Sequence, residues 1–219
     1  MKLREQIIET ICKTKIIAII RGLEKQDAVQ AAQALHAGGI QLIEVALSQK
    51  DNGDAAIQAI YSIREQIPDI CVGAGTVLTK EQLAEADQAG AQYIISPNVS
   101  DAVIRETRNK ELVSIPGAFS ASEAMSAYEA GADFIKIFPV AAVGPDYVRA
   151  LKTPLTQLRF IAVGGVNEKN AYMYLQAGAA GVGVSGNLIN RQWIEEKRYK
   201  KITDLAVEYV RAVNRKVLP

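Results

Sequence analysis

Eight short apolar runs recur along the chain, and a segment with helical patterning follows each of them. The runs are KIIAII ending at Ile20, IQLIEV ending at Val45, ICVGA starting at Ile70, AQYIIS to Ser96, ELVSI to Ile115, DFIKIF to Phe138, RFIAV to Val163 and AGVGV to Val184. Most are apolar on both faces, which is typical of strands in a covered parallel sheet. Eight such modules after one leading N-terminal helix predict an α/β fold, a (β/α)8 TIM barrel.

Helix boundaries support this reading. Thr79 with Gln82, and Ser120 with Glu123, have the spacing of capping boxes. Ala-Gly dipeptides are expected to end the first, third, fifth and seventh helices of the barrel, at Gly38, Gly90, Gly131 and Gly178. The alternative, an open doubly wound sheet, more often has fewer strands and a glycine fingerprint after the first. No linker interrupts the pattern, so one domain is predicted over residues 1–219.

Composition narrows the function classes. The formal net charge of +1 argues against a dedicated nucleic-acid or membrane-surface protein. Cys12 and Cys71 form no close pair and His36 is the one histidine, so neither a disulfide framework nor a metal site is expected. No stretch resembles a signal peptide, a membrane span or a cofactor motif. We therefore expect a cytoplasmic protein that acts without metal or cofactor.

Three charged residues interrupt the apolar runs. Arg21 ends the first run, Glu44 lies in the second and Lys136 lies in the sixth. Because alternate residues of a strand share a face, Lys136 lies on the same face as Phe134 and Phe138. The outer face of a barrel strand packs on helices, so Lys136 is expected to point inward. Chemistry in this fold occurs at the C-terminal ends of the strands.

An amine among apolar groups has a lowered pKa, and its neutral form can attack a ketone to give a Schiff base. The protonated imine withdraws electrons and allows a nearby carbon–carbon bond to break. Glu44 is the carboxylate available as general acid and base. Lys136 and Glu44 could instead form a buried structural ion pair, and this alternative remains open at this point.

Glycines at two neighbouring strand ends suggest an anion site. Gly164 and Gly165 follow the seventh run, and Ser185 and Gly186 follow the eighth. The loops after these two strands are the usual phosphate site of such barrels. Thr76 adds a hydroxyl after the third run.

The chain resembles the 2-keto-3-deoxy-6-phosphogluconate and 4-hydroxy-2-oxoglutarate aldolases, in the stretches IIAIIRG, GGIQLIEVAL, VGAGTVL, ISPN, IPG, FIKIFP, VGGV and GVSG. The resemblance implies a lyase of the class I type, with Lys136 as the Schiff-base lysine and Glu44 as the acid and base. It implies release of pyruvate and glyceraldehyde 3-phosphate in Entner–Doudoroff carbohydrate metabolism, with 4-hydroxy-2-oxoglutarate as a further substrate. It also implies a homotrimer.

The resemblance assigns substrate-binding roles as well. Arg21 and Thr76 would bind the substrate or its pyruvate half, and Pro97 and Phe138 would line the pocket. The phosphate would be held by Gly164, Gly165, Ser185 and Gly186.

Two positions depart from the gluconate pattern. Ser48 stands where many of these enzymes have an arginine, and Val163 where they have a threonine. In having valine at this position, the chain resembles the sister enzymes that cleave the 6-phosphogalactonate epimer. That epimer is the alternative substrate. More distant alternatives are a phosphate-binding barrel epimerase or decarboxylase, and a non-catalytic sugar-phosphate binder.

Overall fold

The computed structural model describes residues 3–48 and 53–215 of the 219-residue chain. Its strands are β1 (Ile16–Arg21), β2 (Leu42–Ala46), β3 (Cys71–Gly75), β4 (Tyr93–Ile95), β5 (Val113–Ile115), β6 (Gly117–Ala118), β7 (Ile135–Ile137), β8 (Phe160–Val163) and β9 (Gly181–Val184). Its helices are α1 (Leu3–Thr14), α2 (Lys25–Ala37), α3 (Asp54–Gln66), α4 (Lys80–Gln88), α5 (Asp101–Asn109), α6 (Ala121–Glu129), η1 (Val140–Ala142), α7 (Gly144–Lys152), α8 (Ala171–Gln176), α9 (Arg191–Glu195) and α10 (Tyr199–Val213).

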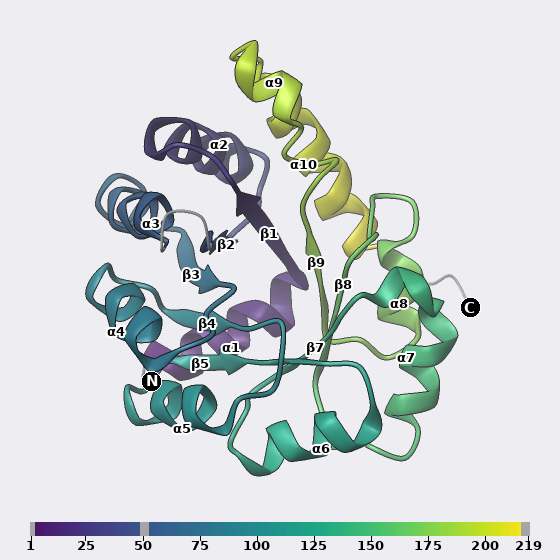
Figure 1. Ribbon diagram of the computed structural model, residues 1–219. Helices are drawn as coiled ribbons and strands as arrows, with labels where there is room; N and C mark the ends of the chain where they lie inside the picture. The colour runs from purple at the N-terminus through teal and green to yellow at the C-terminus, as the bar shows by residue number, and fades with distance from the viewer. Residues whose placement is uncertain (1–2, 49–52, 216–219) are drawn as a thin grey trace.

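The strands form a parallel barrel surrounded by helices (Figure 1). The sheet order is β5-β4-β3-β2-β1-β9-β8-β7-β6, and every recorded pair is parallel. The two end strands, β5 and β6, are consecutive on the chain and are separated by Pro116 alone. They therefore represent one barrel strand that proline divides, since proline lacks the N–H that a ladder needs. The TIM-barrel prediction is confirmed, and the open sheet is excluded.

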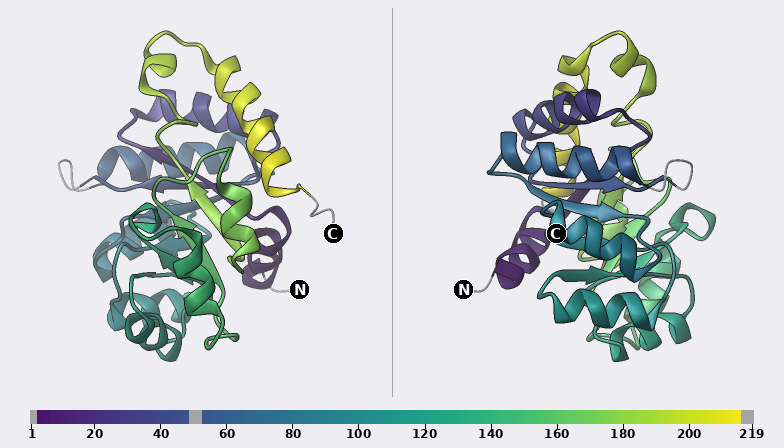
Figure 2. Two further views of the ribbon diagram at one scale, coloured as in Figure 1. Left: turned by 90° about the vertical axis from the view of Figure 1, so that its right-hand side faces the viewer. Right: turned by 60° about the vertical axis from the view of Figure 1, so that its left-hand side comes forward.

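The barrel has an inner and an outer apolar layer. Alternate strand residues such as Ile17, Leu42 and Phe134 are buried inside it, whereas their neighbours pack on the surrounding helices. Helix α1 adds Ile7 and Ile11 to the inner cluster. It lies behind the strands in Figure 1 and projects from the body of the molecule in the right panel of Figure 2. The leading helix therefore closes the N-terminal end of the barrel and leaves the opposite end open.

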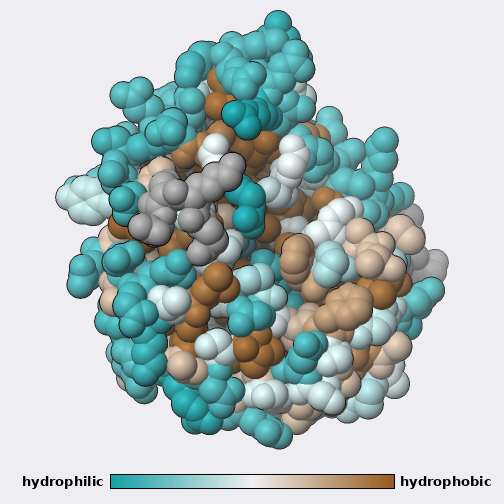
Figure 3. Space-filling view, in the orientation of Figure 1, coloured by the Kyte–Doolittle hydropathy of each residue, from teal (hydrophilic) through white to brown (hydrophobic). Residues whose placement is uncertain are grey.

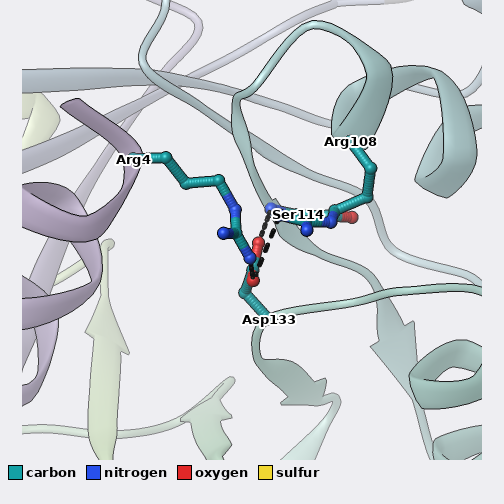
Figure 4. A network of polar contacts seen from close by, with 4 residues as sticks. All are labelled: Arg4, Arg108, Ser114 and Asp133. Carbon is teal, nitrogen blue, oxygen red and sulfur yellow. Dashed lines mark hydrogen bonds and ion pairs between the residues drawn. The ribbon is translucent and has the colours of Figure 1, made fainter. Parts of the chain in front are cut away.

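Charged groups fasten α1 to the strand that carries Lys136 (Figure 4). Arg4 donates a hydrogen bond to Asp133, which precedes β7. The other carboxylate oxygen of Asp133 accepts from the Ser114 backbone N–H at 3.0 Å, and Arg108 lies 3.6 Å from Asp133. Burial raises the pKa of Asp133, and the Ser114 N–H and Arg4 oppose that shift. This network holds the start of β7 in place.

One of the two predicted capping boxes is complete: the Ser120 hydroxyl accepts from the Glu123 N–H, and the Glu123 carboxylate accepts from the Ser120 N–H. At the other, the Thr79 hydroxyl accepts from the Gln82 N–H, but the Gln82 side chain accepts from the Leu78 N–H at 2.7 Å. Helix α2 ends at Gly38 as predicted, although the φ of Gly38 is −83° and it is Gly39 that has the left-handed φ of +91°. Gly38 is required for a different reason: a Cβ there would lie 2.5 Å from the Ala206 Cβ of α10. The glycine permits close packing of helices rather than a left-handed turn.

Helix α10 packs against α2 and α8 and completes the ring of helices around the barrel. Helix α9 and the adjoining end of α10 project beyond the other helices in Figures 1 and 2. None of the helices within 3–48 and 53–215 is long and apolar enough to cross a membrane.

Candidate active site

A cavity of about 670 Å³ opens at the C-terminal ends of the strands. Figure 3 shows apolar surface towards the middle of the face seen in Figure 1, with hydrophilic residues mainly around its edge. The described residues that line the cavity are Ile19, Arg21, Thr76, Pro97, Lys136, Phe138, Val163, Gly164, Gly165, Val166, Asn167, Gly183, Ser185, Gly186 and Asn187. Nearly all the residues singled out from the sequence are therefore brought together.

Lys136 reaches this cavity from β7. The residue is 5% exposed, and its amine lies 5.1 Å from the centre of the Phe138 ring. Phe134, two residues earlier, belongs to the inner cluster of the barrel. The inward orientation predicted from strand alternation is thus what the structure has. The amine is sheltered by apolar groups yet faces a space that a substrate can fill.

Glu44 lies inside the barrel on β2 and is 1% exposed. Gly75 on β3 makes room for it, because a Cβ at that glycine would lie 1.8 Å from Glu44 Oε1. Burial raises the pKa of Glu44, and the charges of Lys136 and Arg21 oppose this shift. Among the described residues, Glu44 Oε1 has no hydrogen-bond partner. A carboxylate so placed can exchange a proton with a substrate in the cavity.

Lys136 and Glu44 influence each other electrostatically without direct contact. The charge of Lys136 lowers the pKa of Glu44. No ion pair or hydrogen bond joins these two described residues. The buried structural ion pair considered from the sequence is therefore absent. Lys136 lines the cavity, whereas Glu44 is buried and is not among the described residues that line it.

Arg21 and Thr76 meet at the mouth of the cavity. Arg21 is exposed at the end of β1, and its Nη2 donates to Thr76 Oγ1 at 3.4 Å. Thr76 has a φ of +60°, which is unfavourable for a β-branched residue. Such backbone strain is found most often at functional sites. The pair places a cation and a hydroxyl beside the space in front of Lys136.

Two glycine loops form the other wall. Gly164 and Gly165 have φ values of +97° and +79°, and a Cβ at Gly165 would lie 2.5 Å from the Ala141 Cβ. Ser185 donates its hydroxyl to the Ile19 carbonyl at 3.0 Å, which ties the second loop to β1. A Cβ at Gly186 would meet no atom within 4 Å. The backbone is therefore accessible to an anion at this wall.

Comparison with known proteins identifies the family. The family model for KDPG and KHG aldolases, which act on 2-dehydro-3-deoxy-phosphogluconate and 4-hydroxy-2-oxoglutarate, matches residues 7–205. The chain belongs to the KDPG and KHG aldolase family. It is thus an enzyme of the aldolase class, as the resemblance implied.

Relatives within the aldolase family differ in substrate. The chain is 34% identical over 203 residues to the 2-dehydro-3-deoxy-6-phosphogalactonate aldolase of Escherichia coli, covering 92% of this chain and 97% of that protein. It is also 34% identical over 197 residues to the KHG/KDPG aldolase of the same organism, covering 89% and 90%. Family membership therefore does not distinguish between these substrates, and the residues of this chain's own site must do so.

Solved structures of the family share the fold. The KDPG aldolase of Legionella pneumophila, with pyruvate captured as a covalent carbinolamine, superposes with a TM-score of 0.83 at 32% identity, covering 91% of this chain and 96% of that one. A native KDPGal structure gives a TM-score of 0.80 at 34% identity, covering 90% and 93%.

Ser48 does not reach the main cavity of this aldolase. It lines a separate hollow of about 220 Å³ with Gly22, Leu23 and Ala46 among others. Residues 49–52, which follow it, lie outside the described residues. The position is therefore beside the active site rather than in it.

Five lining residues were not predicted from the sequence: Ile19, Val166, Asn167, Gly183 and Asn187. Ile19 and Gly183 look like ordinary strand residues, so no local signal marks them. Asn167 and Asn187 follow the two glycine pairs by two residues and one residue, and this proximity was the available signal. Among the described residues, no cluster of three or more His, Cys, Asp or Glu side chains could hold a metal ion.

Proposed function

We propose that this chain is a class I aldolase that cleaves 2-keto-3-deoxy-6-phosphogluconate to pyruvate and glyceraldehyde 3-phosphate. The observation that carries the proposal is the Lys136 amine, 5% exposed, inside a cavity that also has two glycine loops on its wall. The same chemistry applies to 4-hydroxy-2-oxoglutarate, which would give pyruvate and glyoxylate.

In the proposed reaction, Lys136 adds to the C2 ketone and water leaves to form the iminium ion. Glu44, directly or through a water molecule, removes the proton of the C4 hydroxyl. The C3–C4 bond breaks, its electrons pass into the enamine, and the phosphorylated aldehyde departs. Glu44 then helps return a proton to C3, and water hydrolyses the imine to pyruvate and the free amine.

The binding roles follow the walls of the cavity. Arg21 and Thr76 hold the carboxylate end, since a guanidinium recognises carboxylates well. Pro97 and Phe138 enclose the carbon chain. The loops at Gly164–Gly165 and Ser185–Gly186 hold the phosphate through backbone N–H groups. No metal or cofactor is required for this chemistry.

One observation favours a second substrate, the 6-phosphogalactonate epimer. Val163 lines the cavity and has no hydroxyl with which to read the configuration at C4. Measuring kcat/KM for the two epimers and for 4-hydroxy-2-oxoglutarate separates the candidates.

The decisive experiment is trapping with pyruvate and borohydride. The wild-type chain should gain one reduced pyruvate on Lys136, as peptide mass spectrometry will locate. Lys136→Ala should neither be labelled nor cleave substrate. An epimerase or a non-catalytic binder would not be labelled, so the absence of label on the wild type would overturn the proposal.

We also propose a homotrimer in the cytoplasm, because the resemblance implies that assembly and Cys12 and Cys71 are free thiols. Light scattering on the purified protein tests the trimer: a mass of one chain in solution would contradict it.

A further inference from the structure

Two loops face the proposed phosphate position, and binding requires a constant distance between them. Residues 164–170 follow β8 and residues 185–190 follow β9. β8 and β9 are paired in the sheet, so the two loops leave adjacent strands. Backbone donors from both loops can bind one anion only when their separation is constant.

Asn187 joins the two loops through its side-chain amide. Its Nδ2 donates to Glu168 Oε2 at 3.1 Å, across from one loop to the other. Asn187 lines the cavity, while Glu168 is not among the described residues that line it. The Asn187 amide therefore gives the Glu168 carboxylate a fixed donor. A carboxylate released towards an anion would repel it.

Tyr209 fixes the other side of the same amide. Its hydroxyl donates to Asn187 Oδ1 at 2.7 Å. Tyr209 is 0% exposed and packs in the outer core from α10, so its ring has little freedom to move. Burial, with a smaller contribution from the Glu168 charge, raises the pKa of Tyr209 to about 12. The phenol is therefore a neutral donor at physiological pH.

We propose that Tyr209, acting through Asn187, is a positioning residue that sets the phosphate subsite and thereby the preference for phosphorylated substrates. The inference rests on the proposed function and adds a specificity determinant to it. Loss of the Tyr209 hydroxyl frees the Asn187 amide to rotate, and Glu168 then loses its fixed donor. Both changes weaken binding of the phosphate more than they affect the chemistry at Lys136.

The test compares Tyr209→Phe with the wild type on 2-keto-3-deoxy-6-phosphogluconate and 4-hydroxy-2-oxoglutarate. The kcat/KM for 2-keto-3-deoxy-6-phosphogluconate divided by that for 4-hydroxy-2-oxoglutarate should fall about three- to tenfold, the usual contribution of one hydrogen bond. The inhibition constant of inorganic phosphate should rise by a similar factor. This second readout needs no unphosphorylated substrate.

Tyr199→Phe is the matched control. Tyr199 lies on the same helix, and its hydroxyl donates to Asp27 at 2.7 Å, away from both loops. The control loses an equivalent bond and should change both readouts by less than about twofold. An equal effect from both substitutions would show a general loss of stability and would overturn the inference.

Asn187→Ala breaks the same link from the cavity side and should reproduce the Tyr209→Phe effect on both readouts. The double variant should be no worse than the more affected single variant, because both act through one contact. If the wild-type protein traps pyruvate and Tyr209→Phe binds phosphate as tightly as the wild type does, the inference is overturned. Failure of the wild type to trap pyruvate overturns the proposed function instead, so the two failures are distinguishable.

Discussion

Replacing Gly75 with alanine tests whether the position of Glu44 matters for catalysis. The added Cβ would lie 1.8 Å from Glu44 Oε1 and 2.4 Å from its Cδ, where ordinary contacts begin near 3.4 Å. The carboxylate must therefore move by about 1.5 Å, or β3 must shift. A displacement of about 1 Å can cost about 10²-fold in rate. We expect kcat to fall by at least about 10²-fold, within the range of about 10²–10⁴-fold that loss of a general base causes.

The assay is pyruvate release coupled to lactate dehydrogenase, with thermal unfolding measured in parallel. Gly73→Ala is the matched control, because Gly73 lies two residues earlier on the same strand and its Cβ would lie 2.2 Å from the Tyr93 ring. Both substitutions overpack the barrel and should destabilise it by about 1–3 kcal/mol. Only Gly75→Ala should lose activity far beyond its loss of folded protein. Equal losses of kcat in the two variants would refute the reasoning.

Three further changes have defined outcomes. Because burial raises the pKa of Glu44 above its ordinary 4.5, its contribution to stability is present below that pH and is lost as the pH rises through the raised value. Urea unfolding should therefore find Glu44→Gln more stable than wild type at neutral pH, with the gap closing below 4.5, although kcat falls; a gap that widens in acid contradicts this. The buried Tyr93 hydroxyl has no partner among the described residues, so Tyr93→Phe should raise the free energy of unfolding by about 1–2 kcal/mol, and a decrease would show that the hydroxyl is bonded. Val163→Thr should shift the kcat/KM ratio towards the gluconate epimer by about three- to tenfold, and an unchanged ratio would remove Val163 from substrate selection.

Local patterns predicted much of the fold and the centre of the site. Strand alternation identified the inward face of the sixth run, and the structure has Lys136 on that face. The Ser120–Glu123 spacing identified a helix start, and the capping box is there. These predictions succeeded because each depends on residues within one strand or one helical turn.

Local patterns gave only part of the answer where distant segments meet. Gly38 ends α2 as predicted, but the need for glycine there comes from close packing against α10. The resemblance placed Ser48 at the substrate site; in the structure it lines a neighbouring hollow after β2, and its role in binding stays a prediction. Neither outcome is encoded in the nearby residues, since each depends on the direction in which the chain leaves a regular element.

By itself, the sequence determined the eight-module barrel, the inward lysine and the buried carboxylate, because periodicity decides which face of an element is apolar. Only the tertiary structure decided that Gly75 makes room for Glu44, and that Tyr209 holds Asn187 22 residues away along the chain. The physical reason is that such contacts are set by how separate strands and helices pack. A local pattern does not contain that information.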